Sequence, residues 1–242
     1  TLHRKLADRI VALRPEIRER LQQKGLADEV YRFDPDRFNP AVPLGGNLLY
    51  AVPIKRISQQ NLAGKSRFIQ TLHDLGLAEE ALKIAQGVID TLAHTFGRDD
   101  TDHPLFRNLG LDAATYEAAV GLVEKTRRPD APPISDAELG TLLTVPFRIS
   151  AEQIGPTFPE ELKTRILDLR QSHSSELLDC LGDLFAPLEE DGFSSGLTVL
   201  ENAIFGKLSQ DAGGRADDIR FCSVRLAIVA PRFDFGQVEV QQ

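Results

Sequence analysis

The first recurring pattern of apolar residues covers residues 2–24. Leucine and isoleucine recur there at steps of three and four residues, which is the spacing of one face of an amphipathic helix. This apolar stripe consists of Leu2, Leu6, Ile10, Leu13, Ile17 and Leu21. Pro15 lies inside the pattern and predicts a bend or a split into two helices, and Gly25 predicts where the segment ends.

Apolar residues at helical spacing recur in five later segments. These are residues 58–77, 78–96, 112–128, 159–185 and about 214–230. The first two are predicted to meet near Gly76, and Pro159 suits the first turn of the longest helix. Helices are therefore expected over most of the chain.

Two short polar sequences mark further helix starts. Ser135 precedes Glu138 by three residues, and Ser150 precedes Gln153 by the same step. In such a capping box the two side chains satisfy backbone N–H groups of the first turn. Strand signals are weak, because β-branched residues alternate only over short runs. We therefore predict a mainly α fold, an irregular helical bundle with long loops and few or no strands.

The net charge of the chain bears on which kinds of molecule it can bind. The 242-residue chain has a formal net charge of −8, which argues against nucleic acid as a partner. The predicted helix at 2–24 is nevertheless basic, with seven Lys or Arg residues against three acids. A helix lying on a membrane surface is one interpretation. The preferred one is the solvated outer face of a helix packed on a core, so direct lipid contact is not expected.

The sequence contains no recognisable catalytic constellation. Asp99, Asp100, Asp102 and His103 lie close together and could attract a divalent cation, although a solvated turn is the preferred interpretation. The sequence LAGKS at 62–66 ends like a phosphate-binding loop, but Gln59 stands where that loop needs its first glycine. Cys180 and Cys222 form no metal or redox motif, and two cysteines suit a reducing cytosol. We therefore assign no catalytic, cofactor-binding or metal-binding residue.

One stretch resembles a known family. The sequence LTVLENAIFGK at 197–207 is similar to a segment of ABC-transporter nucleotide-binding domains written T-[VI]-x-E-N-[ILV]-x-F-G. The places of that segment are filled by Thr198, Val199, Glu201, Asn202, Ile204, Phe205 and Gly206. In that family the segment lies near the coupling helix of the membrane partner. The resemblance makes Glu201, Asn202 and Phe205 candidate coupling or interface residues, with helix capping and loop bracing as the alternative role.

A weaker second copy of this stretch occurs at residues 33–53. Asn47 stands where the other copy has Asn202, while Gly46 replaces Glu201 and Tyr50 replaces Phe205. Each copy also follows a Phe-x-Pro sequence, at 33–35 and at 185–187. The spacing from that sequence to the asparagine differs between the copies. We therefore regard a duplication as suggested by the sequence, and Asn47 as a fourth candidate interface residue.

The chain resembles the helical insertion of large bacterial ABC ATPases. Similar phrases stand at 102–106, 142–149 and 162–170. The resemblance divides residues 1–242, a single helical domain or a fragment of a larger ATPase, into four parts. They are a basic amphipathic helix at 1–32, a loop with the first asparagine motif at 33–57, the helical insertion at 58–183, and the segment with the LTVLENAIFG motif at 184–242.

The resemblance also carries functional expectations. Walker A, the signature sequence and Walker B are absent, so the chain is expected to be inactive alone, and MgATP is implied for the parent protein only. The implied partners are a membrane-spanning transporter domain and a second ATPase domain, at the cytoplasmic face of a bacterial membrane. A stand-alone helical adaptor that binds other proteins is the alternative. An enzyme with its site near Asp99–His103 is a third possibility.

Overall fold

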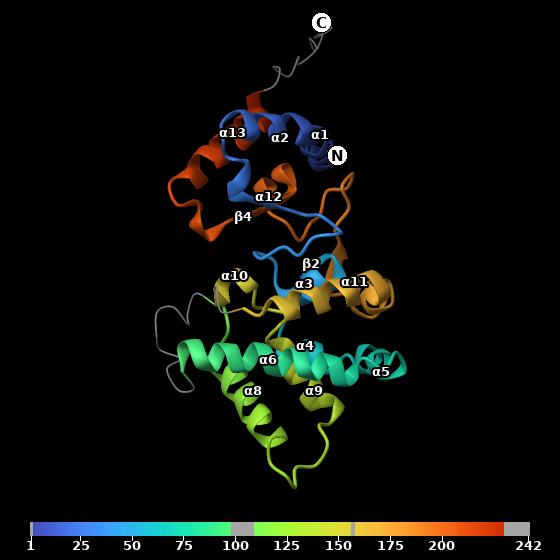
Figure 1. The fold of residues 1–242 in the computed structure, drawn as a ribbon. Coiled ribbons are helices and arrows are strands. Elements are labelled where there is room, and N and C mark those ends of the chain that lie inside the picture. Colours follow the sequence, from blue (N-terminus) through green and yellow to red (C-terminus); the bar gives the residue numbers. More distant parts are fainter. Residues whose placement is uncertain (1, 98–108, 156–157, 230–242) are drawn as a thin grey trace, which may run out of the picture.

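The computed structural model describes residues 2–97, 109–155 and 158–229. The acidic turn at Asp99–His103 and the phrase at 102–106 lie outside these residues. The described chain is mainly helical, as predicted, and its helices gather into two lobes (Figure 1). None of the described helices combines the length and the apolar character needed to cross a lipid bilayer.

We call the lobe that contains both ends of the described chain the terminal lobe. Its elements are α1 (Leu2–Ala12), α2 (Arg14–Gln23), η1 (Ala27–Glu29), β1 (Val30–Arg32), α12 (Val199–Ile204), β4 (Gly206–Leu208), η2 (Gln210–Ala212) and α13 (Arg215–Val229). In Figure 1 it is the upper half, where α13 lies beside α2. The split between α1 and α2 falls at Leu13, two residues before Pro15, which confirms the predicted break.

The central lobe is one continuous stretch of chain. Its elements are α3 (Leu44–Leu49), β2 (Ala51–Pro53), α4 (Gln59–Ala63), α5 (Ser66–Asp74), α6 (Ala78–Phe96), α8 (Ala113–Thr126), α9 (Asp136–Thr144), α10 (Ala151–Ile154), α11 (Glu160–Leu181) and β3 (Phe185–Pro187). The capping boxes at Ser135 and Ser150 both form, as predicted. Ser58 forms another with Asn61 at the start of α4.

The four described strands are three residues long and pair across the sequence. In the terminal lobe β1 pairs antiparallel with β4, and Val30 lies opposite Leu208. In the central lobe β2 pairs antiparallel with β3, and Pro53 lies opposite Phe185. Each small sheet therefore joins a strand from the first part of the chain to a strand from the last part.

Two predicted segments differ from the structure. Residues 58–77 were expected to form one helix, but α4 ends before Gly64 and α5 begins at Ser66. Residues 33–57 were expected to be a loop, but they contain α3 and β2. The N–H groups of Leu44 and Gly45 at the start of α3 donate to carbonyl oxygens of Ile149 and Pro146. Because these acceptors lie about 100 residues further along the chain, no local sequence pattern predicts this helix.

Each lobe has its own apolar core. In the central lobe Phe147 packs edge-on against Phe68 and Phe185, with ring centroids 5.9 Å and 5.7 Å apart. The terminal lobe buries Ile10 and Ile17 against α12 and α13, so the basic first helix packs on a core as expected. A third cluster, which we call the waist, lies where the chain crosses between the lobes. It consists of Phe33, Val42, Val52, Leu188, Leu197 and Phe205, with Tyr50 packed against it.

A pair of helical glycines gives a direct test of the central-lobe packing. A Cβ atom at Gly140 in α9 would lie 2.6 Å from Cα of Ala63 in α4, whereas one at Gly121 in α8 would have no heavy atom within 4 Å. We expect Gly140→Ala to lower the free energy of unfolding by about 1–3 kcal/mol through overpacking. The matched Gly121→Ala change should raise it by about 0.5–1 kcal/mol through helix propensity. Urea denaturation of both variants measures the difference, and two equal effects would contradict this packing.

Candidate functional site

The candidate residue Glu201 belongs to the start of α12. The Thr198 hydroxyl accepts from the Glu201 N–H, and the Glu201 carboxylate accepts from the Thr198 N–H at 2.8 Å, so the two residues form a capping box. The same carboxylate pairs with Lys207 of β4 at 2.5 Å. Glu201 therefore ties the first turn of α12 to the strand that follows it.

The amide of Asn202 braces the loop that leads into α12. Its Nδ2 atom donates to the carbonyl oxygens of Ser194 at 2.9 Å and Leu197 at 3.2 Å, and also to that of Thr198. Its Oδ1 atom accepts from the Ser194 N–H at 2.9 Å. The side chain is 0% exposed. A buried amide with every polar atom bonded fixes the path of the loop.

Asn47 makes the same bonds in the first half of the chain. Its Nδ2 atom donates to the carbonyl oxygens of Asn39 and Val42, eight and five residues earlier, and its Oδ1 atom accepts from the Asn39 N–H. Asn202 bonds Ser194 and Leu197 at the same two spacings. The two asparagines are therefore equivalent parts of a repeated loop, as the weaker second copy in the sequence suggested.

Arg170 of α11 clamps the first of these loops. Its Nη1 atom donates to the carbonyl oxygens of Asp34, Pro35 and Arg37, its Nε atom donates to that of Asn47 at 2.5 Å, and its Nη2 atom donates to Asn47 Oδ1. The residue is only 5% exposed, and this burial lowers the pKa of its guanidinium from the ordinary value.

Arg14 of α2 clamps the second loop in the same way. Its Nε atom donates to the Asn202 carbonyl at 2.8 Å, and its Nη atoms donate to the carbonyls of Glu189, Glu190 and Gly192. These three acceptors stand in the same positions relative to Asn202 as Asp34, Pro35 and Arg37 do relative to Asn47. Arg14 is also 5% exposed, and burial lowers the pKa of its guanidinium.

The short helix that follows each loop, α3 or α12, ends at an aromatic residue in the left-handed backbone conformation. Tyr50 has φ 48° and Phe205 has φ 46°, and they are the two non-glycine residues of the described chain with positive φ. The Arg170 guanidinium lies 5.5 Å from the Tyr50 ring centroid, and that of Arg14 lies 4.4 Å from the Phe205 centroid. A cation over an aromatic face offsets part of the cost of burying the charge and the strained backbone.

The first repeat consists of α2, β1, α3 and β2, and the second consists of α11, β3, α12 and β4. Elements of each repeat pack against elements of the other. The helix and first strand of the first repeat, α2 and β1, pack with the short helix and second strand of the second, α12 and β4. In return, α11 and β3 pack with α3 and β2. Equivalent backbone bonds cross the waist, from the Phe33 N–H to the Phe205 carbonyl and from the Leu188 N–H to the Tyr50 carbonyl. The waist is therefore built twice, around a pseudo-twofold relation.

This arrangement corrects the sequence alignment of the two copies. Phe33 was matched with Phe185, but the bonds across the waist make Leu188 its counterpart. Phe185 in β3 corresponds to Val30 in β1, since Phe185 pairs with Pro53 as Val30 pairs with Leu208. With this pairing the spacing to the asparagine agrees in both copies. The arginine clamps were missed altogether, because each arginine lies on a helix distant in sequence from the loop that it binds.

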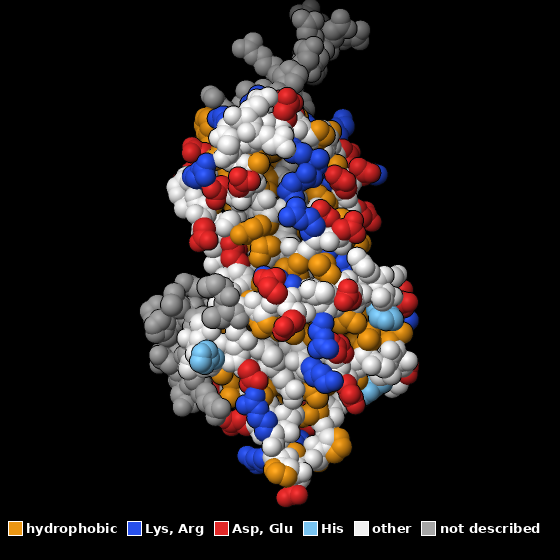
Figure 2. Space-filling view, viewed as in Figure 1, with side chains coloured by type: hydrophobic (Ala, Val, Ile, Leu, Met, Phe, Trp, Pro, Cys, Tyr) orange, Lys and Arg blue, Asp and Glu red, His pale blue; other side chains and the backbone are white. Residues whose placement is uncertain are grey.

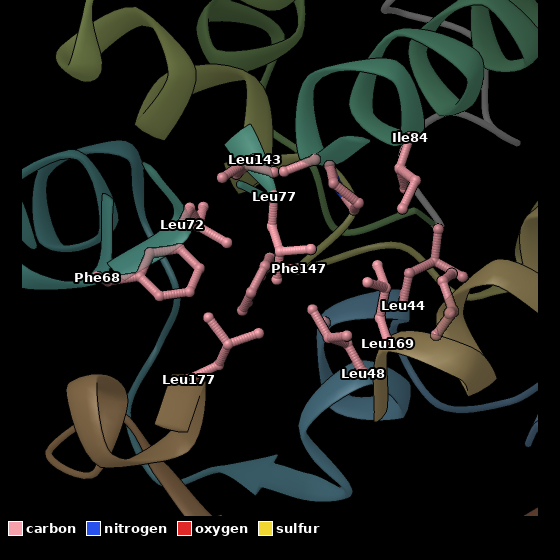
Figure 3. A pocket seen from close by; sticks show the side chains of 14 residues that line it. Leu44, Leu48, Phe68, Leu72, Leu77, Ile84, Leu143, Phe147, Leu169 and Leu177 are labelled. Atoms are coloured by element: carbon pink, nitrogen blue, oxygen red, sulfur yellow. The ribbon is translucent and has the colours of Figure 1, made fainter. Parts of the chain in front are cut away.

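A cavity of about 40 Å³ lies in the central lobe (Figure 3). Apolar side chains from α3, α5, α6 and α11 line it, among them Leu44, Phe68, Ile84 and Leu169, together with Gly45. None of the described residues that line it is charged. Among the described residues, no group of three or more His, Cys, Asp or Glu side chains is placed to hold a metal ion.

The chain matches no protein-family model, and no curated protein or solved structure resembles it significantly. The waist is therefore interpreted from its own contacts. It brings Phe205 together with Tyr50, and it places Asn47 and Asn202 at the two loops that cross between the lobes. A direct interface role for Glu201, Asn202, Phe205 and Asn47 stays a prediction.

The Glu201–Lys207 pair predicts a pH effect on stability. Burial raises the pKa of the Glu201 carboxyl, but the hydrogen bond and charge of Lys207, together with bonds from Thr198, outweigh burial and leave the pKa lowered. A carboxyl whose pKa is lower in the folded state stabilises the fold above its unfolded pKa of about 4.3, and this contribution is lost as the pH falls through the folded pKa.

We expect Glu201→Gln to lower the free energy of unfolding by about 1 kcal/mol at pH 7 and by much less near pH 3. Urea denaturation across this pH range measures the change. Glu161→Gln, at an exposed carboxyl on α11, is the control and should differ little from the parent at either pH. A Glu201→Gln deficit that is the same at both pH values would contradict the ion pair.

Proposed function

We propose that this chain is a non-catalytic helical region of an ABC-transporter ATP-binding protein, which holds two lobes in a defined orientation and couples or regulates through them. The supporting observation is the position of the family-like motif. Its Asn202 and Phe205, with their counterparts Asn47 and Tyr50, build the waist through which the chain passes twice. Because these residues pack where the two lobes meet, a displacement of one lobe could be transferred through them to the other.

The packing of the waist supports the proposal of coupling between the lobes. Two segments cross between the lobes, each is held by an arginine clamp, and the polar atoms of both asparagine amides are bonded. Discrete packed arrangements, rather than soft linkers, carry energetic coupling between distant sites. In this proposal the parent protein binds MgATP, the partners are a membrane-spanning domain and a second ATPase domain, and the site of action is the cytoplasmic face of a bacterial membrane.

The first test is the reading frame on both sides of Thr1 and Gln242. A GxxxxGK[ST] sequence upstream, with a signature sequence and a Walker B strand downstream, is the expected result. A start codon immediately before Thr1 and a stop codon immediately after Gln242 would exclude an ATPase parent.

The second test separates partner contact from internal bracing. In the full transporter, Glu201→Ala should lower transport relative to ATP hydrolysis if Glu201 contacts the partner. Lys207→Ala is the matched control, because it removes the same ion pair and leaves the carboxylate in place. Equal transport-to-hydrolysis ratios in both variants and the parent would reject a coupling role for Glu201.

A stand-alone adaptor that binds other proteins is the second candidate function. Large apolar side chains are exposed on the terminal lobe, including Val199 at 51% and Leu6 at 47%. Exposed apolar groups of this kind mark protein-binding faces when they lie together. Affinity capture followed by light scattering tests this candidate, and a stable soluble complex with a protein unrelated to any transporter would favour it.

A further inference from the structure

The repeated units allow the two lobes to be compared position by position. Arg14 corresponds to Arg170, because both clamp the same carbonyl positions. Counting residues from these arginines, along α1 and α2 in one repeat and along α11 in the other, Ile10 corresponds to Ile166 and Leu21 to Leu177. All four side chains are at most 4% exposed, which supports the correspondence.

Two positions break this agreement. By the same correspondence Leu6 on α1 matches Leu162 on α11, and Val199 on α12 matches Leu44 on α3. Leu162 packs against the central-lobe core and Leu44 is 2% exposed, whereas Leu6 is 47% and Val199 is 51% exposed. The terminal lobe therefore exposes apolar side chains that the central lobe covers. Since α1 packs against α12, the two exposed side chains come from neighbouring elements.

Helix α6 provides the cover in the central lobe. Its Ile84 lies over Leu44 in the apolar cavity (Figure 3). At Gly87, where α6 passes α11, a Cβ would lie 3.4 Å from Leu162 Cδ1, an ordinary contact distance, so the two helices lie side by side here. An ion pair of 3.0 Å also joins Arg165 of α11 to Glu80 in the first turn of α6.

The terminal lobe repeats the neighbour of α6 but not α6 itself. Helix α13 packs on α2 as α5 packs on α11. No element within the described residues takes the place that α6 has over α3 and α11. Helix α1, which carries the exposed Leu6, is basic, and its basic residues include Arg4 and Lys5, both exposed. Figure 2 shows basic side chains together with apolar ones on one face of this lobe.

We propose that Leu6 and Val199 form a docking face for an amphipathic helix of a partner protein, bound as α6 binds the central lobe. The helix would place an apolar stripe on these two side chains. Its first turn would be acidic, because it meets the basic side of α1. This inference rests on the repeat alone, and it holds for either function proposed above.

A peptide with the sequence of residues 76–97 is the probe, because it contains α6 with its acidic first turn. Titrated with the full chain, the fluorescently labelled peptide should show saturable binding by anisotropy. Leu6→Asp and Val199→Asp should each weaken binding by about tenfold or more, since a charge would be buried under the helix. A peptide with Glu79→Lys and Glu80→Lys should also bind more weakly, most clearly at low salt.

Ile54→Asp is the control, because Ile54 is a comparably exposed apolar residue of the central lobe, at 40%. It should leave the affinity unchanged, and thermal unfolding followed by circular dichroism shows which variants are folded. Because Leu6 and Val199 are half exposed, their variants are expected to fold. Absence of saturable binding would overturn the proposal. So would equal affinity for the parent and the Leu6→Asp and Val199→Asp variants, which would mean that the peptide only displaces α6.

Discussion

Replacing Arg170 by alanine is expected to lower the free energy of unfolding by about 3–5 kcal/mol. The change removes donors from four carbonyl oxygens and from Asn47 Oδ1, all held in or near a buried site. A buried acceptor that loses its partner costs about 1–3 kcal/mol, and the lost stacking on Tyr50 adds to this. Chemical denaturation followed by circular dichroism measures the effect.

Lysine at position 170 separates charge from geometry. It keeps the positive charge but cannot spread donors over several carbonyls as a planar guanidinium does. We therefore expect Arg170→Lys to lose more than half of the stability that Arg170→Ala loses. An exposed arginine on the same helix, Arg165, pairs with Glu80 on the surface, and Arg165→Ala should cost no more than about 1 kcal/mol. Similar losses at positions 165 and 170 would contradict the clamp.

The second large effect is expected at Asn202. Replacement by alanine removes an amide that makes four hydrogen bonds at a site with 0% exposure. The Ser194 N–H and the carbonyls of Ser194 and Leu197 then lose this partner inside the protein. We expect the free energy of unfolding to fall by about 2–4 kcal/mol, measured by urea denaturation.

Asn47→Ala is the natural comparison, because its amide occupies the equivalent place in the other loop. The repeat predicts a loss of similar size at both positions. Asn202→Asp should be at least as harmful as alanine, since a carboxylate cannot donate to the facing carbonyls. A loss below about 1 kcal/mol for Asn202→Ala, or a loss at only one asparagine, would count against the duplicated brace.

Most helices could be predicted from the sequence because their signals are local. The stripe of Leu2 to Leu21, the capping boxes at Ser135 and Ser150, and the position of Pro159 all depend on residues within one or two turns. The structure confirms the helices and both capping boxes, and it places Pro159 at the N-cap of α11, one residue before the predicted first turn. The mainly α class follows from the same signals.

The site could be predicted only in part because its contacts span the chain. Asn47 and Asn202 were visible as a repeated sequence, and the structure places them as equivalents. Their clamps, Arg170 and Arg14, were not visible, since they look like ordinary arginines on amphipathic helices. Helix α3 was missed for a similar reason: its first N–H groups are satisfied by Pro146 and Ile149 rather than by a local cap.

The exchange between repeats also constrains how the protein is made. Strand β1 pairs with β4, and α2 packs against α12 and α13. The N-terminal helices therefore cannot complete their packing until residues near the other end of the chain have been synthesised. At ~5–20 residues per second, translation of the intervening sequence takes on the order of ten seconds or more. The central lobe, being continuous, can fold on the ribosome during that time. The amphipathic α1 and α2 stay unpartnered meanwhile, so chaperone contact with the nascent N-terminal segment is expected to end only when β4 and α13 have emerged.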